Sequence, residues 1–150
     1  MSIEIKRRVH ARAQEQISAK IVELETGLEA ARKQANSQQK SSAGDKHETT
    51  RAMAHLEQER YAQMLRETFS LQRQLLAVDV EEVHAEVELG ALLVTTIGCF
   101  YIAAGIGEID SEPSCWVMSP SAPLAEELEG LEVGDRFRFR RQWAEILEIY

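Results

Sequence analysis

The chain has 150 residues and a formal net charge of −8 at pH 7, with 44% hydrophobic and 28% charged residues. This length suits one ordinary domain or two small ones, and the composition is typical of a folded chain rather than a disordered one. The acidic balance argues against nonspecific binding to DNA or RNA, which requires clustered Lys and Arg. No apolar run approaches the length of a membrane span, and the N-terminus lacks the apolar core of a signal peptide. We therefore expect a cytoplasmic protein with no membrane partner and no sequence-specific DNA binding.

Charge and cysteine are unevenly distributed along the chain. The N-terminal stretch is basic, and we interpret it as the solvated face of a helix; its residues are Lys6, Arg7, Arg8, His10 and Arg12. An acidic group follows late in the chain and consists of Glu126, Glu127, Glu129 and Glu132. Cys99 and Cys115 lie sixteen residues apart in strand-like sequence, which predicts reduced core thiols rather than a disulfide framework or a zinc site.

Residues 7–39 have the pattern of one long helix. Hydrophobic residues recur at alternating spacings of three and four, which is the seam of a coiled coil; they are Ile17, Ile21, Leu24, Leu28, Ala31 and Ala35. Gly27 is the one weak helix former inside this helix. Residues 46–78 predict a second helix with a less regular seam, made of Met53, Leu56, Met64, Thr68, Leu71 and Leu75.

Residues 41–49 separate the two helices and predict a turn. Gly44 is the natural position for a positive φ, and Asp45 can cap the second helix with Glu48 three residues later. A short, polar connection containing glycine favours an antiparallel hairpin, since helices joined in this way pack as neighbours. A parallel coiled-coil dimer is the alternative. We expect a monomeric hairpin over residues 1–78, with its tip at 41–49.

The pattern changes after residues 79–84, an acidic and aperiodic stretch that we interpret as a linker. Short β-rich runs follow, separated by Gly and Pro, and residues 123–129 predict a short helix. The expected strands are 85–89, 92–96, 100–104, 115–118, 136–140 and 144–150. Residues 79–150 thus predict a small mixed α+β domain, and the whole chain an α+β fold. We expect Trp116, Trp143, Phe137 and Phe139 to be core residues, and His10, His55 and His84 to lie on the surface.

Two sets of residues resemble the bacterial transcript-cleavage factors of the GreA/GreB family. The family's hairpin tip reads Gly-Asp-Leu-(Lys or Ser)-Glu, and this chain has Gly44-Asp45-Lys46-His47-Glu48. The family's second domain contains Tyr-x-Ile-Val-Gly, Glu-Ala-Asp and Ser-Pro-Leu-Gly-Arg-Ala-Leu-Leu-Gly-Lys-x-Val-Gly-Asp. The counterparts are Tyr101–Gly105, Glu108–Asp110 and Pro123–Asp135. After Glu48, the family's Asn-Ala-Glu-Tyr is replaced by Thr49-Thr50-Arg51-Ala52, which lacks an acid and an aromatic residue.

The resemblance implies a coiled-coil hairpin followed by an FKBP-like domain, with bacterial RNA polymerase as the partner. It implies that the hairpin enters the polymerase's secondary channel, where Asp45 and Glu48 help to hold a magnesium ion beside the 3′ end of a backtracked RNA. The protein would not itself be an enzyme, because the polymerase performs the hydrolysis. The resemblance also implies that the globular domain docks on the polymerase near 119–128, with Ser119, Pro120, Pro123 and Leu124 as the binding residues.

Other functions remain open at this point. Asp-x-x-Glu at a helix start is also an ordinary capping box, and capping and metal support are compatible. A regulator of the same fold could block or tune the channel without stimulating cleavage. A prolyl isomerase and a coiled-coil assembly protein are further alternatives, although about 65 residues leave little room for the isomerase's pocket.

Overall fold

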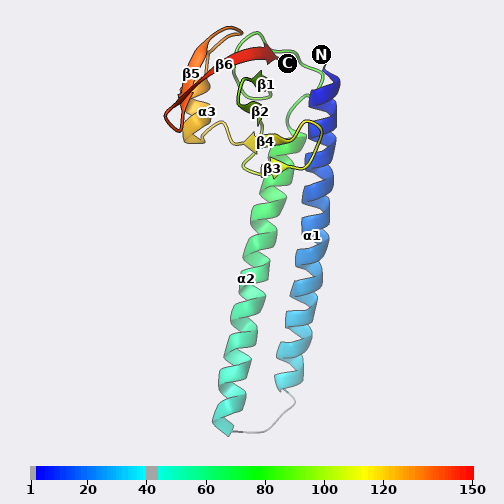
Figure 1. The fold of residues 1–150 in the computed structure, drawn as a ribbon. Coiled ribbons are helices and arrows are strands. Elements are labelled where there is room, and N and C mark those ends of the chain that lie inside the picture. The colour runs from blue at the N-terminus through cyan, green and yellow to red at the C-terminus, as the bar shows by residue number, and fades with distance from the viewer. Residues whose placement is uncertain (1–2, 40–43) are drawn as a thin grey trace. The chain divides into compact units, whose positions relative to one another are not determined.

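The computed structural model describes residues 3–39 and 44–150, and the side chains of residues 3–37 and 48–150. It is an α+β fold in which a long helical hairpin precedes a small mixed sheet, as expected (Figure 1). The described residues form two compact units, residues 17–70 and residues 3–16 together with 71–150. The elements in order are α1 (Glu4–Gln39), α2 (Gly44–Leu76), β1 (Leu92–Thr95), β2 (Gly98–Ile102), β3 (Gly107–Ile109), β4 (Cys115–Met118), α3 (Pro123–Leu128), β5 (Arg136–Phe139) and β6 (Gln142–Ile149).

Within residues 17–70, α1 and α2 lie side by side and run in opposite directions (Figure 1). The predicted seam of α1 is confirmed, because five of its six residues are buried and Leu28 is half-buried. Burial of the seam against the neighbouring helix is the main source of stability for a helix of this length, whose propensity alone is weak.

The seam of α2 differs from the predicted one. Met53 and Leu56 are each 65% exposed, whereas a regular heptad of buried or half-buried residues runs through Ala54, Gln58, Tyr61, Leu65, Thr68, Gln72 and Leu75. The prediction is confirmed at Thr68 and Leu75, which are buried, and was wrong at Met53 and Leu56, where it selected large apolar side chains. The buried face instead uses Ala, Thr and Gln, and the Thr68 hydroxyl donates a hydrogen bond to the Met64 carbonyl at 2.7 Å.

Gly27 leaves room for the ring of Tyr61 to pack against α1. A Cβ atom at Gly27 would lie 2.4 Å and 2.6 Å from two carbons of that ring, closer than real Cβ contacts allow. The glycine costs α1 about 1 kcal/mol of helix propensity relative to alanine. The aromatic side chain in the α2 heptad therefore explains the glycine at position 27 of α1.

We expect Gly27→Ala to lower the free energy of unfolding by about 1 kcal/mol, because displacing the packed ring costs more than the gain in helix propensity. In a Tyr61→Ala background the same substitution should instead stabilise the hairpin by about 1 kcal/mol. Urea unfolding followed by circular dichroism measures both. A stabilising Gly27→Ala in the otherwise unchanged chain would show that the ring moves away at no cost.

The sheet belongs to the unit formed by residues 3–16 and 71–150. Its six strands are ordered β3-β4-β2-β1-β6-β5. All neighbours are antiparallel except β2 and β4, which pair in parallel with Cys99 opposite Cys115 and Phe100 opposite Trp116. This makes the sheet mixed, with β3 and β5 at its edges.

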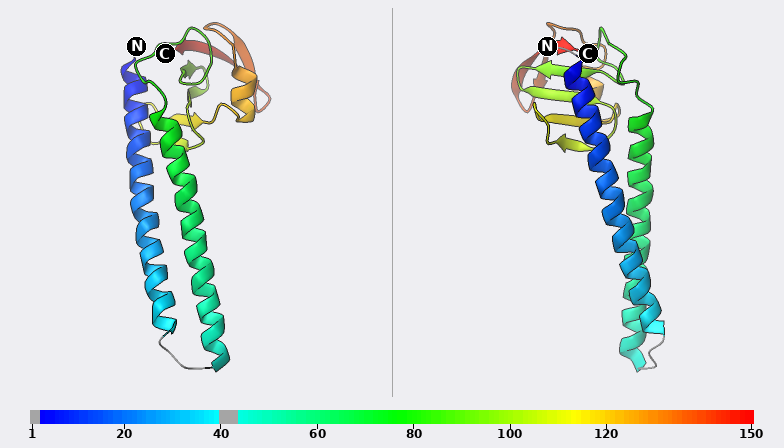
Figure 2. Two further views of the ribbon diagram at one scale, coloured as in Figure 1. Left: turned by 180° about the vertical axis from the view of Figure 1, so that it is seen from behind. Right: turned by 90° about the vertical axis from the view of Figure 1, so that its right-hand side faces the viewer.

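Each face of the sheet carries its own core. On one face the start of α1 packs over the strands, as Figure 2 shows, through Ile5, Val9 and Ala13 against residues that include Leu92, Tyr101 and Val117. On the other face α3 packs through Ala125 and Leu128 against strand residues that include Leu93, Phe100, Ile102, Phe137 and Ile146. The sheet therefore lies between the start of α1 and α3.

Several predicted boundaries hold and two do not. The helix predicted at 123–129 is α3. Residues 85–89 are not a strand, since the segment forms only an isolated bridge between Glu86 and Glu132. Val87 anchors this segment instead, through backbone hydrogen bonds of 2.8 Å with Leu131 and Gly130 and a side chain that is 1% exposed. The three-residue β3 lies where the sequence predicted only turns.

None of the helices in the described part of the chain is both long enough and apolar enough to cross a membrane.

Candidate functional site

The two acids of the predicted tip lie at the start of α2. The helix begins at Gly44, so Asp45 lies in its first turn rather than preceding it, and the expectations of a capping Asp45 and a turn at Gly44 are corrected. Residues 41–43 of the predicted turn lie outside the described residues. Asp45 and Glu48 are three positions apart in one helix, which places them on the same face. The side chain of Glu48 is exposed; that of Asp45 is not described.

Two carboxylates on one helix face suit a shared magnesium ion better than a site of their own. Magnesium keeps several waters and is commonly held by one or two carboxylates together with substrate phosphates. Among the residues whose side chains are described, no group of three or more His, Cys, Asp or Glu is placed to hold a metal.

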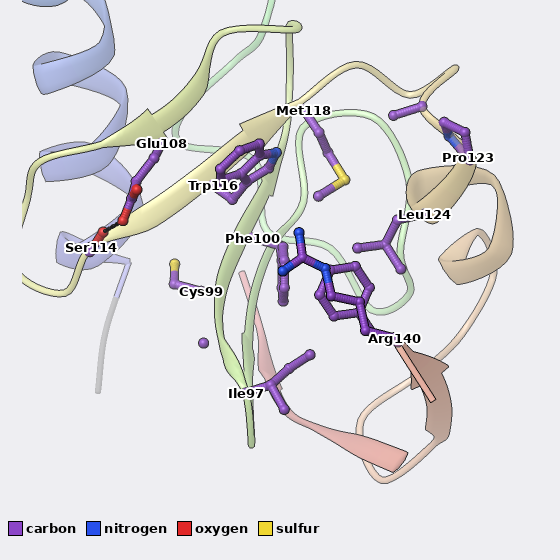
Figure 3. Close-up of a pocket in the computed structure, with 13 residues that line it drawn as sticks. Ile97, Cys99, Phe100, Glu108, Ser114, Trp116, Met118, Pro123, Leu124 and Arg140 are labelled. Atoms are coloured by element: carbon purple, nitrogen blue, oxygen red, sulfur yellow. Dashed lines mark hydrogen bonds between the residues drawn. The ribbon is translucent and has the colours of Figure 1, made fainter. Parts of the chain in front are cut away.

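A pocket of about 580 Å³ lies on the α3 side of the sheet (Figure 3). Apolar side chains make most of its wall: Ile97, Phe100, Trp116, Met118, Leu124 and Phe139. They come from the β1–β2 turn, β2, β4, α3 and β5, so the sheet and the short helix together shape the cavity. Trp116 is 49% exposed, which makes it a large apolar side chain accessible to a partner.

Polar groups stand at opposite ends of this pocket. At one end the Ser114 hydroxyl donates to the Glu108 carboxylate at 2.9 Å (Figure 3). At the other end is Arg140, whose guanidinium lies 5.0 Å from the centre of the Phe139 ring. An apolar cavity with a few fixed polar groups is the usual form of a recognition site.

The four residues predicted to bind a partner divide into two pairs. Pro123 and Leu124 line the large pocket at the start of α3. Ser119 and Pro120 do not line it. They belong to the preceding turn, where the Ser121 amide donates to the Ser119 hydroxyl at 3.2 Å and the Ala122 amide donates to the Ser119 carbonyl at 3.0 Å. This turn sets the start of the helix that carries Leu124.

Sequence reasoning missed most of the pocket wall. Trp116 was expected in the core, and this is wrong: it alternates with the buried Cys115 and Val117 and lies on the other face of β4. Alternation was the available signal, but it does not tell which face a helix covers. Phe100 and Arg140 gave no such signal, because they join the site only through the strand pairing and the hairpin turn.

Three polar side chains, Lys6, His10 and His84, are buried in the unit formed by residues 3–16 and 71–150. Lys6 is 0% exposed, and its Nζ donates to the Glu82 carbonyl at 2.6 Å. His10 is 7% exposed, and its Nδ1 lies 2.8 Å from the hydroxyl of the fully buried Tyr101. His84 is also buried, with Nδ1 2.6 Å from the Glu88 carboxylate. The expectations of a solvated basic start and of surface His10 and His84 are wrong at these positions, whereas His55 is exposed as predicted.

Burial shifts the pKa values of Lys6, His10 and Tyr101. Desolvation, with the nearby Lys6 charge, lowers the pKa of His10 below its ordinary 6.5. Desolvation also lowers the pKa of Lys6, although the carboxylates of Glu82, Asp79 and Glu81 oppose this. Burial raises the pKa of the Tyr101 hydroxyl. The fold thus favours the neutral form of the His10 imidazole.

Because the folded-state pKa of His10 is below the unfolded value of 6.5, the unfolded chain binds the proton more tightly. The stability that neutral His10 contributes is present above pH 6.5 and is lost as the pH falls below it, by at most about 1.4 kcal/mol per pH unit. We expect His10→Gln to reduce this dependence. Urea unfolding of both proteins across this pH range measures the difference, and equal pH slopes would contradict it.

Cys99 and Cys115 are buried free thiols, as predicted. Their sulfur atoms lie 2.7 Å apart between paired positions of β2 and β4. The hydrogen bond with Cys99, together with burial, raises the pKa of Cys115, which keeps this thiol protonated at neutral pH.

In comparisons with known proteins, no family model and no curated protein matches the chain.

Proposed function

We propose that this chain is a divergent Gre-type transcription elongation factor, a cytoplasmic monomer that binds bacterial RNA polymerase. In this proposal the helical hairpin enters the secondary channel and the sheet unit, FKBP-like in type, docks outside it. The observation that carries the proposal is that Pro123 and Leu124, from the stretch that resembles the family's Ser-Pro-Leu-Gly run, line the apolar pocket beside an exposed Trp116.

The pocket has the properties of a protein-docking site. Its wall combines exposed aromatic and aliphatic side chains, which dominate binding energy in protein interfaces. The guanidinium of Arg140 stands at one end and gives the site a charged group that can pair with a carboxylate of a partner. A helix end or loop with an apolar side chain and an acidic neighbour fits this arrangement.

The hairpin supplies the acids that the reaction needs. A magnesium ion held jointly with the polymerase would orient the attacking water and neutralise charge on the RNA phosphate. Asp45 and Glu48 lie three positions apart in α2, which places them on the same helix face. Their task is to add ligands to a site that the polymerase already provides.

Trp116→Ala together with Leu124→Ala should lower the affinity for RNA polymerase core enzyme at least tenfold, because both side chains lose their contact in the pocket. Leu76→Ala is the matched control, since Leu76 is 62% exposed and does not line the pocket. Surface-immobilised polymerase measures the binding, and circular dichroism checks the fold. Unchanged binding by a folded double variant would place the contact elsewhere and remove the main support for the proposal.

One observation favours a second function, a channel-blocking regulator of the same fold. The acid and the aromatic residue that follow Glu48 in the family pattern are absent, since Thr49-Thr50-Arg51-Ala52 stand there. A wild-type protein that binds polymerase and slows transcription, yet stimulates no RNA cleavage at millimolar magnesium, would establish this alternative.

A further inference from the structure

The outer surface of the β5–β6 hairpin is basic and aromatic in an otherwise acidic chain. Residues 136–141 read Arg-Phe-Arg-Phe-Arg-Arg, four arginines in six positions. By alternation, Phe137 faces the core, so Arg136 and Arg138 lie on the opposite face. Trp143, opposite Arg138 in the pairing, is 57% exposed, and the expectation of a core Trp143 is wrong. We call Arg136, Arg138, Arg141 and Trp143 the arginine surface.

Two arginines of this surface, Arg136 and Arg138, lie over the indole of Trp143. The guanidinium of Arg136 lies 5.3 Å from the centre of the Trp143 ring, and that of Arg138 lies 5.9 Å from it. Cation–π attraction holds such side chains near the ring while their donors remain available. Among the described residues, no carboxylate lies within ion-pair distance of any of the four arginines in 136–141, although Glu145 is the cross-strand neighbour of Arg136.

Two arginines in the β5–β6 turn have positive φ angles, which residues with side chains disfavour. Arg140 and Arg141 form the two-residue connection between Phe139 and Gln142, and their φ angles are 49° and 66°. Such turns strongly prefer Asn-Gly or Asp-Gly, because side chains at positive φ are strained. Arginine at both positions costs conformational energy that glycine would avoid, which indicates that the charges themselves have a use.

We propose that the arginine surface binds single-stranded nucleic acid. Arg136 and Arg138 are two residues apart on one strand, about 7 Å, so they can follow successive phosphates of an extended strand. The exposed indole offers a stacking platform for an unpaired base, the combination by which proteins hold single strands without sequence preference. A duplex offers no free base face to the indole, and an acidic peptide offers nothing planar to stack.

Neither the net charge nor the position of β5 at the sheet edge explains this surface. The net charge of −8 disfavours binding over the whole molecule, but the arginines are local and contacts to phosphate act at short range in salt. Charged residues on an edge strand prevent unwanted strand pairing. That role requires no exposed tryptophan and no arginines placed over its ring.

The test uses the full chain with fluorescein-labelled oligouridylate of about twelve nucleotides at about 0.05 M salt. Trp116→Phe leaves Trp143 as the only tryptophan, so quenching of its fluorescence reports stacking directly. We expect saturable binding with quenching, and a slope of log affinity against log salt of about −2, from three phosphate contacts. Oligothymidylate of the same length separates RNA preference from general single-strand binding, and binding of either supports the proposal.

Variants locate the site. Trp143→Ala should weaken binding at least tenfold, and Trp143→Phe should restore part of the loss, since phenylalanine still stacks. Arg136→Gln with Arg138→Gln should reduce the salt slope to about −0.7. The matched control is Arg32→Gln with Arg66→Gln, which removes the same charge from exposed positions of the hairpin helices and should change the affinity less than twofold.

Four outcomes would overturn the proposal. They are no saturable binding at low salt, binding without quenching of Trp143, equal losses in the two double-arginine variants, and equally tight, equally quenched binding of an oligoglutamate peptide. The last would identify the arginine surface as a site for acidic protein instead.

Discussion

Asp45→Asn and Glu48→Gln should each reduce the stimulated cleavage of backtracked RNA at least tenfold, while polymerase affinity stays within about twofold of the unchanged protein. On the proposed function, a magnesium ion held by one carboxylate instead of two would be neither positioned nor retained, and it could not orient the attacking water. The amides keep nearly the shape of the acids, so the contacts of the hairpin are preserved. Loss of charge in the first turn of α2 costs the helix about 0.3–1 kcal/mol, too little to unfold it.

Glu59→Gln is the matched control for the tip acids. It removes the same charge from an exposed position of the same helix, about 16 Å along its axis from Glu48, and should leave cleavage unchanged. The assay uses a stalled, backtracked complex at millimolar magnesium, with binding measured in parallel. An Asp45→Asn protein with full cleavage activity would show that the acid serves the helix alone. The proposed function at the tip would then fail, whereas docking through the pocket would remain open.

The helical part of the fold was predictable because its period is long and repeated. Ile17, Ile21 and Leu24 satisfy one periodicity over several turns, and their burial confirms it. In α2 the same rule failed at Met53 and Leu56, since apolar size was weighted above period. A strict heptad through the correctly predicted Thr68 and Leu75 would have found Ala54 and Leu65 as further buried positions.

The strands of the sheet were predictable from the sequence, but the face on which each side chain lies was not. Alternation places Trp116 and Trp143 opposite buried neighbours, yet only the tertiary structure decides which face α1 or α3 covers. A tryptophan in a short strand is therefore ambiguous between core and recognition surface. The candidate pocket has the same origin, because Phe100, Leu124 and Arg140 come from elements far apart in sequence and meet only through the strand order.

The basic N-terminal stretch shows most clearly where prediction from the sequence fails. Composition assigns Lys6 and His10 to a solvated face, but helical periodicity places them beside Ile5 and Val9 on the buried side of α1. A buried lysine needs an acceptor, and the Glu82 carbonyl that supplies it lies 76 residues away in sequence. No local pattern reveals such a partner.

Lys6→Ala should lower the free energy of unfolding by about 3 kcal/mol, the largest stability effect expected for a charged residue of this chain. The substitution removes a fully buried aliphatic stem and leaves a cavity between α1 and segment 79–84. It also removes the donor to the Glu82 carbonyl, and loss of such a bond costs about 1–3 kcal/mol when the acceptor stays buried. Urea unfolding at neutral pH measures the change.

Lys6→Met separates packing from charge. Methionine fills most of the same space but donates no hydrogen bond, so the expected cost is about 1 kcal/mol, smaller because burial of the ammonium group is itself unfavourable and lowers the pKa of Lys6. Arg12→Ala provides the comparison on the same helix, at an exposed position that should change stability by less than about 0.5 kcal/mol. If Lys6→Ala were as mild as Arg12→Ala, the ammonium group would have to be hydrated and the start of α1 free of segment 79–84. If Lys6→Met were as severe as Lys6→Ala, the hydrogen bond rather than the stem would hold that segment in place.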